Sequence, residues 1–395
     1  MNRQEFQNNI YVAIDHIDNA PTEKNGRIIH GHPCFYLKND KDEFDMELGR
    51  VISNKETFSK YDFNYVLNHM IKYELNEYDS HTRAYFYDVK RLPILFKVID
   101  NKVYIINSLY KDYIGMEVKS INGVSIEKVI EELDFMTCYA SFDYFKGIIA
   151  NSLSDVSTLK SLPSIGDVDK ITFEGDYSKL TIDTNKIDDW PPSTTRSSNY
   201  EIEVYDDTLK INYLACRDEN QMIEAVETMK NTEGIEHYIV SIRGNYGGNS
   251  NINNHLVEFL KDKDTYVLCD ERVFSSARMC LADLKKNGAT VIGKRPGTPV
   301  SAFGNLGNKK YFLDMKMLVV GSVNYWYYDE DLNLTGLTKE NFRDVLKNHP
   351  EILETRFLDV DYEVDFTLED YLTNNDTMLQ FTLDLIKEKN EVKKR

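Results

Sequence analysis

The sequence lacks several features that would narrow its class at once. The chain of 395 residues has only five cysteines, which are widely spaced and form no CxxC pair. An odd number cannot close completely into internal disulfides, so we expect reduced thiols. No apolar run is long enough to span a membrane, and the N-terminus lacks the unbroken apolar stretch of a secretory signal. The sequence predicts a soluble, cytoplasmic protein, although a secreted chain whose signal had been removed would look the same.

Motifs that bind metals or phosphates are also absent. The chain contains no HExxH motif and no glycine-rich motif of the Walker or dinucleotide type. His30, His32 and Cys34 alternate along one segment, but no partner motif completes a tetrahedral zinc site. We therefore expect neither a metal nor another cofactor.

Positive charge is in deficit. With 65 acidic and 47 basic residues the net charge is −18, so the mean field repels phosphate backbones and anionic membranes. We expect neither nucleic acid nor a membrane as partner. Hydrophobic residues make up 42% and charged residues 28%, which is typical of globular proteins, and the length favours two or three domains.

The pattern of hydrophobic residues divides the chain into three regions. Residues 1–85 form a mostly helical N-terminal region, residues 86–190 a small β-rich module, and residues 191–395 an α/β domain. The segment Trp190–Ser198 combines two prolines with hydroxyl residues and indicates a linker. Beyond it, helices and strands alternate as in βαβ units around a mostly parallel sheet. The elements expected there are helices at 220–230, 252–261 and 276–286 and strands at 237–242, 265–269 and 289–292.

The glycine-rich loop Arg243–Asn249 follows the predicted strand 237–242 directly. This strand is apolar on both faces, as a central strand covered by helices should be. The carboxyl ends of such strands open into the crevice where ligands bind. Glycines let main-chain N–H groups face a ligand, so the loop could supply half of an oxyanion hole. The alternative is a plain strand-to-helix turn.

A second loop places Ser275 at the N-terminus of the predicted helix 276–286. Unpaired N–H groups and the helix dipole stabilise a developing oxyanion there. The alternative is that Ser275 or Ser276 merely caps the helix.

The segment Asp79-Ser80-His81-Thr82 offers a general base, because histidine titrates near neutral pH. The other histidines can be explained as surface or capping residues. They are His16, His30, His32, His69, His237, His255 and His349.

Together these loops resemble the serine peptidases that include the carboxyl-terminal processing (tail-specific) proteases and the tricorn protease. Residues 238–248 are similar to that family's strand and Arg-x-Asn-x-Gly-Gly loop, and Phe274–Ala277 to its nucleophile segment. Tyr78–Thr82 resembles its Asp-x-His-Thr element, and the Ile-Asn-Gly sequence at 121–123 resembles its PDZ-like module. Residues 354–364 are more weakly similar to the closing strand of that family.

The resemblance implies an α/β fold with a crotonase/Clp-protease-like catalytic domain, a PDZ-like β-rich module and a helical N-terminal region. It also implies a serine peptidase of the histidine-based branch, because no lysine follows at the position used by the dyad enzymes. Ser275 would be the nucleophile and His81 the base, with Ser80 and Glu354 holding the imidazole. The N–H groups of Gly247 and Ser276 would form the oxyanion hole.

One departure from the family pattern is Arg278, where many relatives have glutamate. A cation there could change substrate preference or indicate lost catalysis. The expected partner is a peptide or unfolded protein, with self-association left open. Two alternatives remain: a catalytically silent peptide- or ligand-binding protein on the same scaffold, and an α/β-hydrolase or crotonase-like acyl-CoA enzyme. The absence of a GxSxG motif weakens the hydrolase version.

Overall fold

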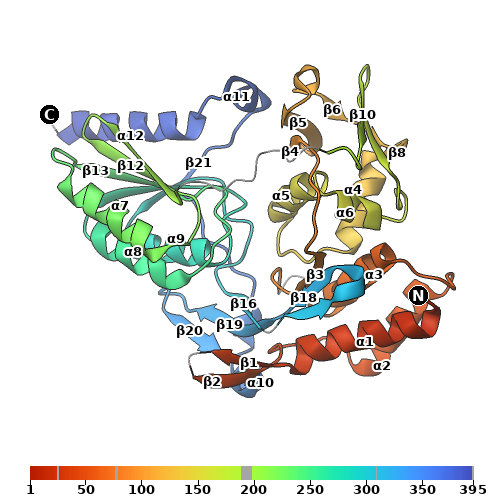
Figure 1. Cartoon of the computed structure of the whole chain (residues 1–395). Coiled ribbons are helices and arrows are strands. Elements are labelled where there is room, and N and C mark those ends of the chain that lie inside the picture. The colour runs from red at the N-terminus through yellow and green to blue at the C-terminus, as the bar shows by residue number, and fades with distance from the viewer. Residues whose placement is uncertain (25, 76–78, 188–197, 308, 394–395) are drawn as a thin grey trace. The chain divides into compact units, whose positions relative to one another are not determined.

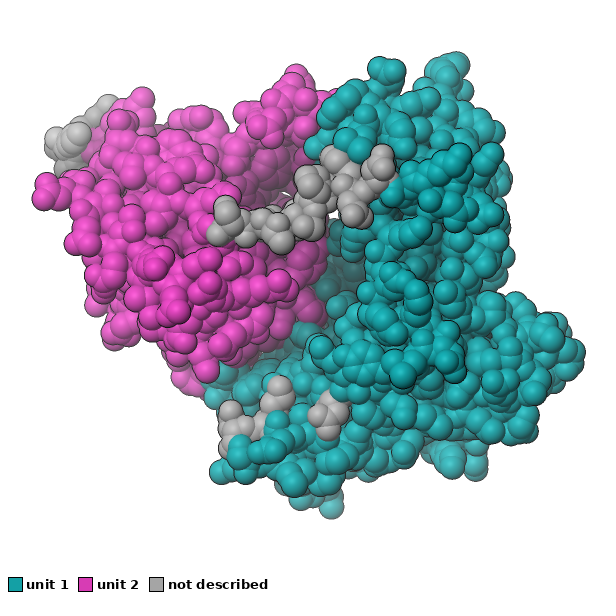
Figure 2. All heavy atoms as spheres, viewed as in Figure 1, with its two compact units in different colours: residues 1–193, 301–327, 334–355 teal, residues 194–300, 328–333, 356–395 magenta. Residues whose placement is uncertain are grey.

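The computed structural model describes residues 1–24, 26–75, 79–187, 198–307 and 309–393. These divide into two compact units, drawn in Figure 1 and coloured separately in Figure 2. Unit 1 comprises residues 1–193, 301–327 and 334–355, and unit 2 comprises residues 194–300, 328–333 and 356–395. The predicted linker 190–198 lies outside the described residues except for Ser198. Among the described residues, no helix combines the length and apolar character needed to cross a membrane.

Unit 2 is built on one twisted sheet with the strand order β11-β12-β13-β14-β15-β21. The first pair of strands is antiparallel, and the pairs that follow are parallel. This mostly parallel arrangement confirms the α/β pattern expected from the sequence. The strands are β11 (Tyr200–Tyr205), β12 (Thr208–Tyr213), β13 (His237–Ser241), β14 (Asp264–Cys269), β15 (Thr290–Gly293) and β21 (Tyr362–Glu363).

Helices cover both faces of this sheet (Figure 1). Helices α7 (Glu219–Asn231), α8 (Asn253–Leu260) and α9 (Ser276–Lys286) share one hydrophobic core with Tyr238 and Val240 of β13. On the other face, Ile239 packs in a second core with residues of α12 (Thr377–Lys393), which follows α11 (Leu368–Thr373). Because successive side chains of a strand point to opposite faces, the apolar run Tyr238–Val240 of β13 supplies both cores.

Unit 1 contains two hydrophobic cores. The first lies among three N-terminal helices, a late helix and several short strands, and it includes Phe6, Phe44, Phe63 and Phe303. The helices are α1 (Arg3–Asn19), α2 (Lys41–Ile52), α3 (Lys60–Leu75) and α10 (Lys339–Asn348). The strands are β1 (Pro21–Lys24), β2 (Arg27–His30), β3 (Arg83–Phe86), β16 (Ala302–Leu306), β17 (Lys310–Phe312), β18 (Met317–Val320), β19 (Ser322–Tyr328) and β20 (Leu334–Leu337).

The second core of unit 1 belongs to residues 92–187 and is built from two small antiparallel sheets and three helices. One sheet has the strand order β4-β5-β6 and the other β10-β9-β7-β8. The strands are β4 (Ile94–Ile99), β5 (Lys102–Ser108), β6 (Glu117–Val118), β7 (Ser120–Ile121), β8 (Val124–Ser125), β9 (Lys170–Glu174) and β10 (Lys179–Asp183). The helices are α4 (Ile126–Phe135), α5 (Phe142–Ser152) and α6 (Val156–Ser161).

The first boundary between the units, at residues 193/194, lies close to the predicted boundary at residue 191, but residues 191–395 do not form one unit. Residues 301–327 and 334–355 belong to unit 1, because β18 pairs antiparallel with β3 from Arg83↔Val320 to Phe86↔Met317. The N–H of Ser322 also donates to Thr82 Oγ1 at 2.9 Å, just beyond the histidine loop. Two segments from the α/β half of the sequence, residues 301–327 and 334–355, thus complete the unit that carries His81.

Candidate active site

Ser275 lies between β14 and α9 in an unusual backbone conformation. Its φ is 53° and its ψ is −126°, a region that residues other than glycine rarely occupy. Such strain costs about 1–3 kcal/mol and persists only where the surrounding structure imposes it. Ser275 holds the N-cap position of α9, yet within the described residues its side chain makes no capping hydrogen bond. The half-buried hydroxyl is therefore not used to cap the helix, which was the alternative explanation for this serine.

The glycine-rich loop packs directly against this strained turn. A Cβ added to Gly247 would lie 2.7 Å from Ser275 Cβ and 2.9 Å from the carbonyl oxygen of Phe274. A Cβ added to Gly248, whose φ is 144°, would lie still closer to the carbonyl oxygen of Cys216, at 2.2 Å. Glycine is required at both positions, because a side chain would clash with the serine turn at residue 247 and with the main chain of Cys216 at residue 248.

Asn245 organises the loop from a fully buried position. Its Nδ2 donates to the carbonyl of Tyr213 at 2.8 Å, and its Oδ1 accepts the N–H of Gly247 at 2.8 Å. Its own carbonyl accepts the N–H of Phe274 at 3.1 Å, which joins the loop to the serine turn. One of the two amides that the sequence assigned to the oxyanion hole, that of Gly247, is therefore already hydrogen-bonded to Asn245.

Ser276 ties the two loops together from the serine side. Its hydroxyl donates to the carbonyl of Gly248 at 2.8 Å, and its carbonyl accepts from Asn253 Nδ2 at 2.8 Å. Within the described part of the chain, neither the N–H of Gly248 nor that of Ser276 meets an acceptor. Ser276 directly follows Ser275, and Gly248 is joined to Ser276 through its carbonyl.

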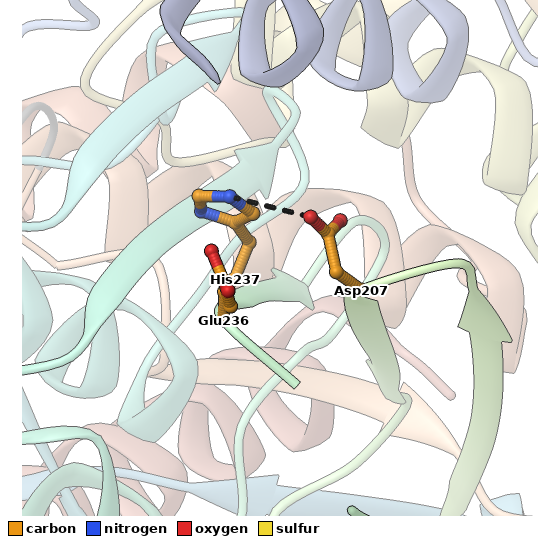
Figure 3. Close-up of side chains that lie close together, drawn as sticks. All are labelled: Asp207, Glu236 and His237. Carbon is orange, nitrogen blue, oxygen red and sulfur yellow. Dashed lines mark ion pairs between the residues drawn. The ribbon is translucent and has the colours of Figure 1, made fainter. Parts of the chain in front are cut away.

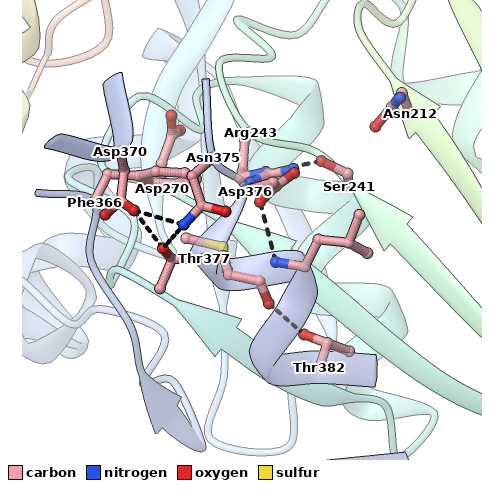
Figure 4. Close-up of polar contacts among 12 residues, drawn as sticks. Asn212, Ser241, Arg243, Asp270, Phe366, Asp370, Asn375, Asp376, Thr377 and Thr382 are labelled. Atoms are coloured by element: carbon pink, nitrogen blue, oxygen red, sulfur yellow. Dashed lines mark hydrogen bonds and ion pairs between the residues drawn. The ribbon is translucent and has the colours of Figure 1, made fainter. Parts of the chain in front are cut away.

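Arg243 fixes the base of the glycine-rich loop to the helix on the opposite face of the sheet (Figure 4). Its guanidinium makes two parallel hydrogen bonds to Asp376, at 2.7 and 2.8 Å, and a third to Ser241 Oγ at 3.0 Å. Asp376 also accepts the N–H of Leu379 at the start of α12. Burial raises the pKa of Asp376, but the hydrogen bonds and charge of Arg243 outweigh it, and the net pKa lies below its usual value.

In unit 1, His81 follows a carboxylate that is completely buried. Asp79 Oδ1 accepts the N–H of His81 at 2.6 Å and lies 3.6 Å from His81 Nδ1. Asp79 Oδ2 accepts hydrogen bonds from Thr82 Oγ1 and from His32 Nε2. Burial by itself would raise the pKa of Asp79, but the hydrogen bonds from His32 and His81 hold it well below its usual range. The carboxylate therefore stays charged beside the imidazole.

The neighbourhood of His81 also includes β16, since a Cβ placed on Gly304 would lie 3.9 Å from His81 Cε1. Ser80 is half-buried, and it lines a cavity of about 330 Å³ within unit 1 together with Thr82. Glu354 also belongs to unit 1, where it is exposed at the end of the 3₁₀ turn η4 (Pro350–Leu353). The role of Ser80 and Glu354 in holding the imidazole of His81 stays a prediction. Tyr78 lies outside the described residues.

Arg278, the departure from the family pattern, is only 2% exposed. Its guanidinium donates to the carbonyl of Pro299 at 2.9 Å and lies 5.9 Å from the ring centre of Tyr328. These contacts lie within unit 2 and direct the cation into its interior. The arrangement gives Arg278 a structural role.

The structure also brings together Asp207, Glu236 and His237, whose oxygen and nitrogen atoms are close enough to suggest a cation site (Figure 3). Both ring nitrogens of His237 are already engaged, one with Asp264 at 2.6 Å and the other with Asn390 at 3.2 Å. A metal would have to displace one of these partners. His237 of β13 therefore connects the start of β14, through Asp264, with α12, through Asn390.

Comparison with known proteins places the chain by its fold. It is similar to mature CPAF complexed with lactacystin, with a TM-score of 0.64 and 11% identity over 97% of each chain. A second structure of mature CPAF gives 0.61 and 11% over 94% of each chain. The tricorn protease gives 0.46 and 14%, over 98% of this chain and 37% of that one. No protein-family model matches the chain, and no curated protein matches its sequence.

The chain therefore has the fold of the tail-specific serine peptidases, as the resemblance in its loops suggested. At this level of identity the likeness shows the fold and leaves the activity to be argued from the residues. The sequence motifs include Asp79 and Asn245 without assigning either residue a role, and they do not include Asp376. The Asp-x-His spacing could have pointed to Asp79, whereas nothing local pointed to Asp376, which lies 133 residues from its partner Arg243.

Proposed function

We propose that this chain is a serine peptidase in which Ser275 is the nucleophile and His81 the general base. The observation that carries the proposal is the conformation of Ser275, at φ 53° and ψ −126°, with a hydroxyl that does not cap α9. A protein that used this serine only to begin a helix would have no reason to maintain the strain. Strained nucleophile turns that expose a hydroxyl are typical of hydrolases.

In this mechanism the hydroxyl oxygen of Ser275 attacks a peptide carbonyl while His81 accepts its proton. The resulting imidazolium returns the proton to the leaving amine, and an acyl-enzyme remains. His81 then takes a proton from water as the water oxygen attacks the acyl group, and it returns that proton to Ser275 Oγ when the acid is released. Asp79 would stabilise the imidazolium, since its charged carboxylate lies 3.6 Å from His81 Nδ1.

The oxyanion would be held by main-chain N–H groups of unit 2. Ser276 supplies one, as the sequence predicts. For the second donor we propose the N–H of Gly248 in addition to the predicted N–H of Gly247, because the N–H of Gly247 already donates to Asn245. Each such donor contributes on the order of 3 kcal/mol in comparable sites.

The proposal extends to the parts of the chain. We assign unit 2 to a crotonase/Clp-protease-like catalytic domain and residues 92–187 to a PDZ-like module that engages a peptide substrate. Ser275 belongs to unit 2 and His81 to unit 1. Catalysis therefore requires the two units to bring these side chains together.

A fluorophosphonate probe tests the nucleophile directly. We expect covalent labelling of the folded protein, located at Ser275 by mass spectrometry and absent from Ser275→Ala. Ser178→Ala is the matched control, because Ser178 is exposed in a turn of unit 1 and should leave labelling unchanged. Labelling that persists in Ser275→Ala would refute the assignment. No labelling of the folded wild type would favour a catalytically silent binding protein on the same scaffold.

A further inference from the structure

The histidine loop is connected to a second histidine that the proposed mechanism does not use. His32 Nε2 lies 3.0 Å from Asp79 Oδ2, and neither side chain has any exposed surface. The two residues are 47 positions apart in the sequence. A buried histidine facing a buried carboxylate requires complementary proton positions, because an unsatisfied polar group is costly in the interior.

The hydrogen bonds of His32 determine its tautomer. The N–H of Cys34 donates to His32 Nδ1 at 3.2 Å, so Nδ1 must carry a lone pair. The ring proton then lies on Nε2, from which it is donated to Asp79 Oδ2. His32 is thus a neutral imidazole with a fixed direction of hydrogen bonding.

Apolar packing also restricts the ring of His32. Its centre lies 4.8 Å from that of Phe303 and 6.4 Å from that of Phe35, both of which are buried in the first core of unit 1. Rotation of the imidazole would break two hydrogen bonds inside this core. His32 is therefore a rigid donor at a defined position.

Asp79 divides its two oxygens between opposite directions. Oδ2 receives the donors from His32 and Thr82, and Thr82 Oγ1 is in turn held by the N–H of Ser322 at 2.9 Å. Oδ1 faces His81, with contacts to its main-chain N–H and to Nδ1. Fixing Oδ2 fixes the plane of the carboxylate, and so fixes the direction in which Oδ1 points.

We infer that His32 is a positioning residue for the general base, acting through Asp79. By holding the carboxylate in place it keeps the proton of neutral His81 on Nδ1 and leaves Nε2 as the basic nitrogen. The inference rests on the proposed role of His81 in catalysis.

Nitrogen chemical shifts in protein labelled with ¹⁵N-histidine test the arrangement in the wild-type chain. We expect neutral His32 to carry its proton on Nε2 and neutral His81 to carry its proton on Nδ1. Finding the proton of His32 on Nδ1, or a rapid exchange between its two tautomers, would overturn the inference without any variant.

The functional part of the test uses two substitutions at one position. His32→Phe removes the donor, whereas His32→Gln retains an N–H that can reach Asp79. In His32→Phe we expect His81 to shift toward the tautomer protonated on Nε2, and kcat to fall on the order of 10- to 100-fold with KM little changed. His32→Gln should retain most of the wild-type kcat and most of the His81 tautomer that is protonated on Nδ1. A folded His32→Phe protein with the wild-type His81 tautomer and kcat would contradict the inference.

The chemical shifts separate this inference from the proposed function. If Ser275 takes no fluorophosphonate label while both histidines show the expected tautomers, the peptidase proposal fails and the hydrogen-bonded chain stands. If Ser275 is labelled but the tautomer of His81 does not depend on His32, the positioning role fails and the peptidase proposal stands.

Discussion

Replacement of Gly247 by alanine should separate the geometry of the active site from the stability of the fold. The new Cβ would lie 2.7 Å from Ser275 Cβ and from the main-chain nitrogen of Ser276. Ordinary contacts of a Cβ begin near 3.4 Å, so the loop or the serine turn must move by about 0.7 Å. The obstructing atoms are main chain and a Cβ, and they have no flexible side chain that could swing aside.

A shift of this size affects the reacting groups directly. Misplacement by about 1 Å can reduce a rate on the order of 100-fold, and loss of one oxyanion donor reduces it by about 100- to 1,000-fold. We therefore expect Gly247→Ala to label with fluorophosphonate at least about 100 times more slowly than the wild type. The assay is the second-order rate of labelling, with circular dichroism and thermal unfolding as tests of the fold.

Gly288 provides a matched control, because it has the same φ of 90° but nothing within 4 Å of an added Cβ. Gly288→Ala carries the backbone strain of about 1–3 kcal/mol without the steric clash. We expect it to lower thermal stability and to keep the wild-type labelling rate. Equal labelling rates for the two variants, both folded, would refute the claim that the glycine-rich loop positions Ser275.

Two further substitutions test the supports of the site. Asp376→Asn should lower the free energy of unfolding by about 2 kcal/mol at pH 7, because Arg243 loses a charged partner. The lowered pKa of Asp376 means that its contribution exists above the unfolded-state value near 3.8 and is lost as pH falls below it. Denaturant unfolding should show the difference from wild type shrinking toward pH 3, and a constant difference would contradict the ion-pair account. Arg278→Met leaves the carbonyl of Pro299 without its donor and should cost about 1–3 kcal/mol while the labelling rate of Ser275 changes only a few-fold. Loss of labelling in folded Arg278→Met protein would instead assign Arg278 to catalysis.

Local sequence signals predicted much of unit 2. The helix expected at 276–286 is α9 (Ser276–Lys286), and the strand expected at 237–242 is β13 (His237–Ser241). Both were readable because hydrophobic periodicity and the positions of glycine and serine agree there. The glycine-rich loop directly follows β13, and the loop that carries Ser275 directly precedes α9, so the places of both candidate loops in the fold were also predictable.

Contacts between segments that are far apart in the sequence could not be predicted from local patterns. No local pattern indicates that β18 pairs with β3, or that residues 301–355 largely complete unit 1. His32 looked like one of several surface histidines, because its burial depends on Phe303 and on Asp79. Asn245 belongs to the glycine-rich motif, but its role could not be inferred from the motif, because it depends on the carbonyl of Tyr213 in a neighbouring strand.

Peptide hydrolysis by Ser275→Ala, His81→Ala and the double variant tests the central claim most directly. If the hydroxyl and the imidazole act as one unit, each single substitution removes nearly all activity and the double variant is little worse than either. Wild-type turnover in His81→Ala, or losses that multiply in the double variant, would contradict the account.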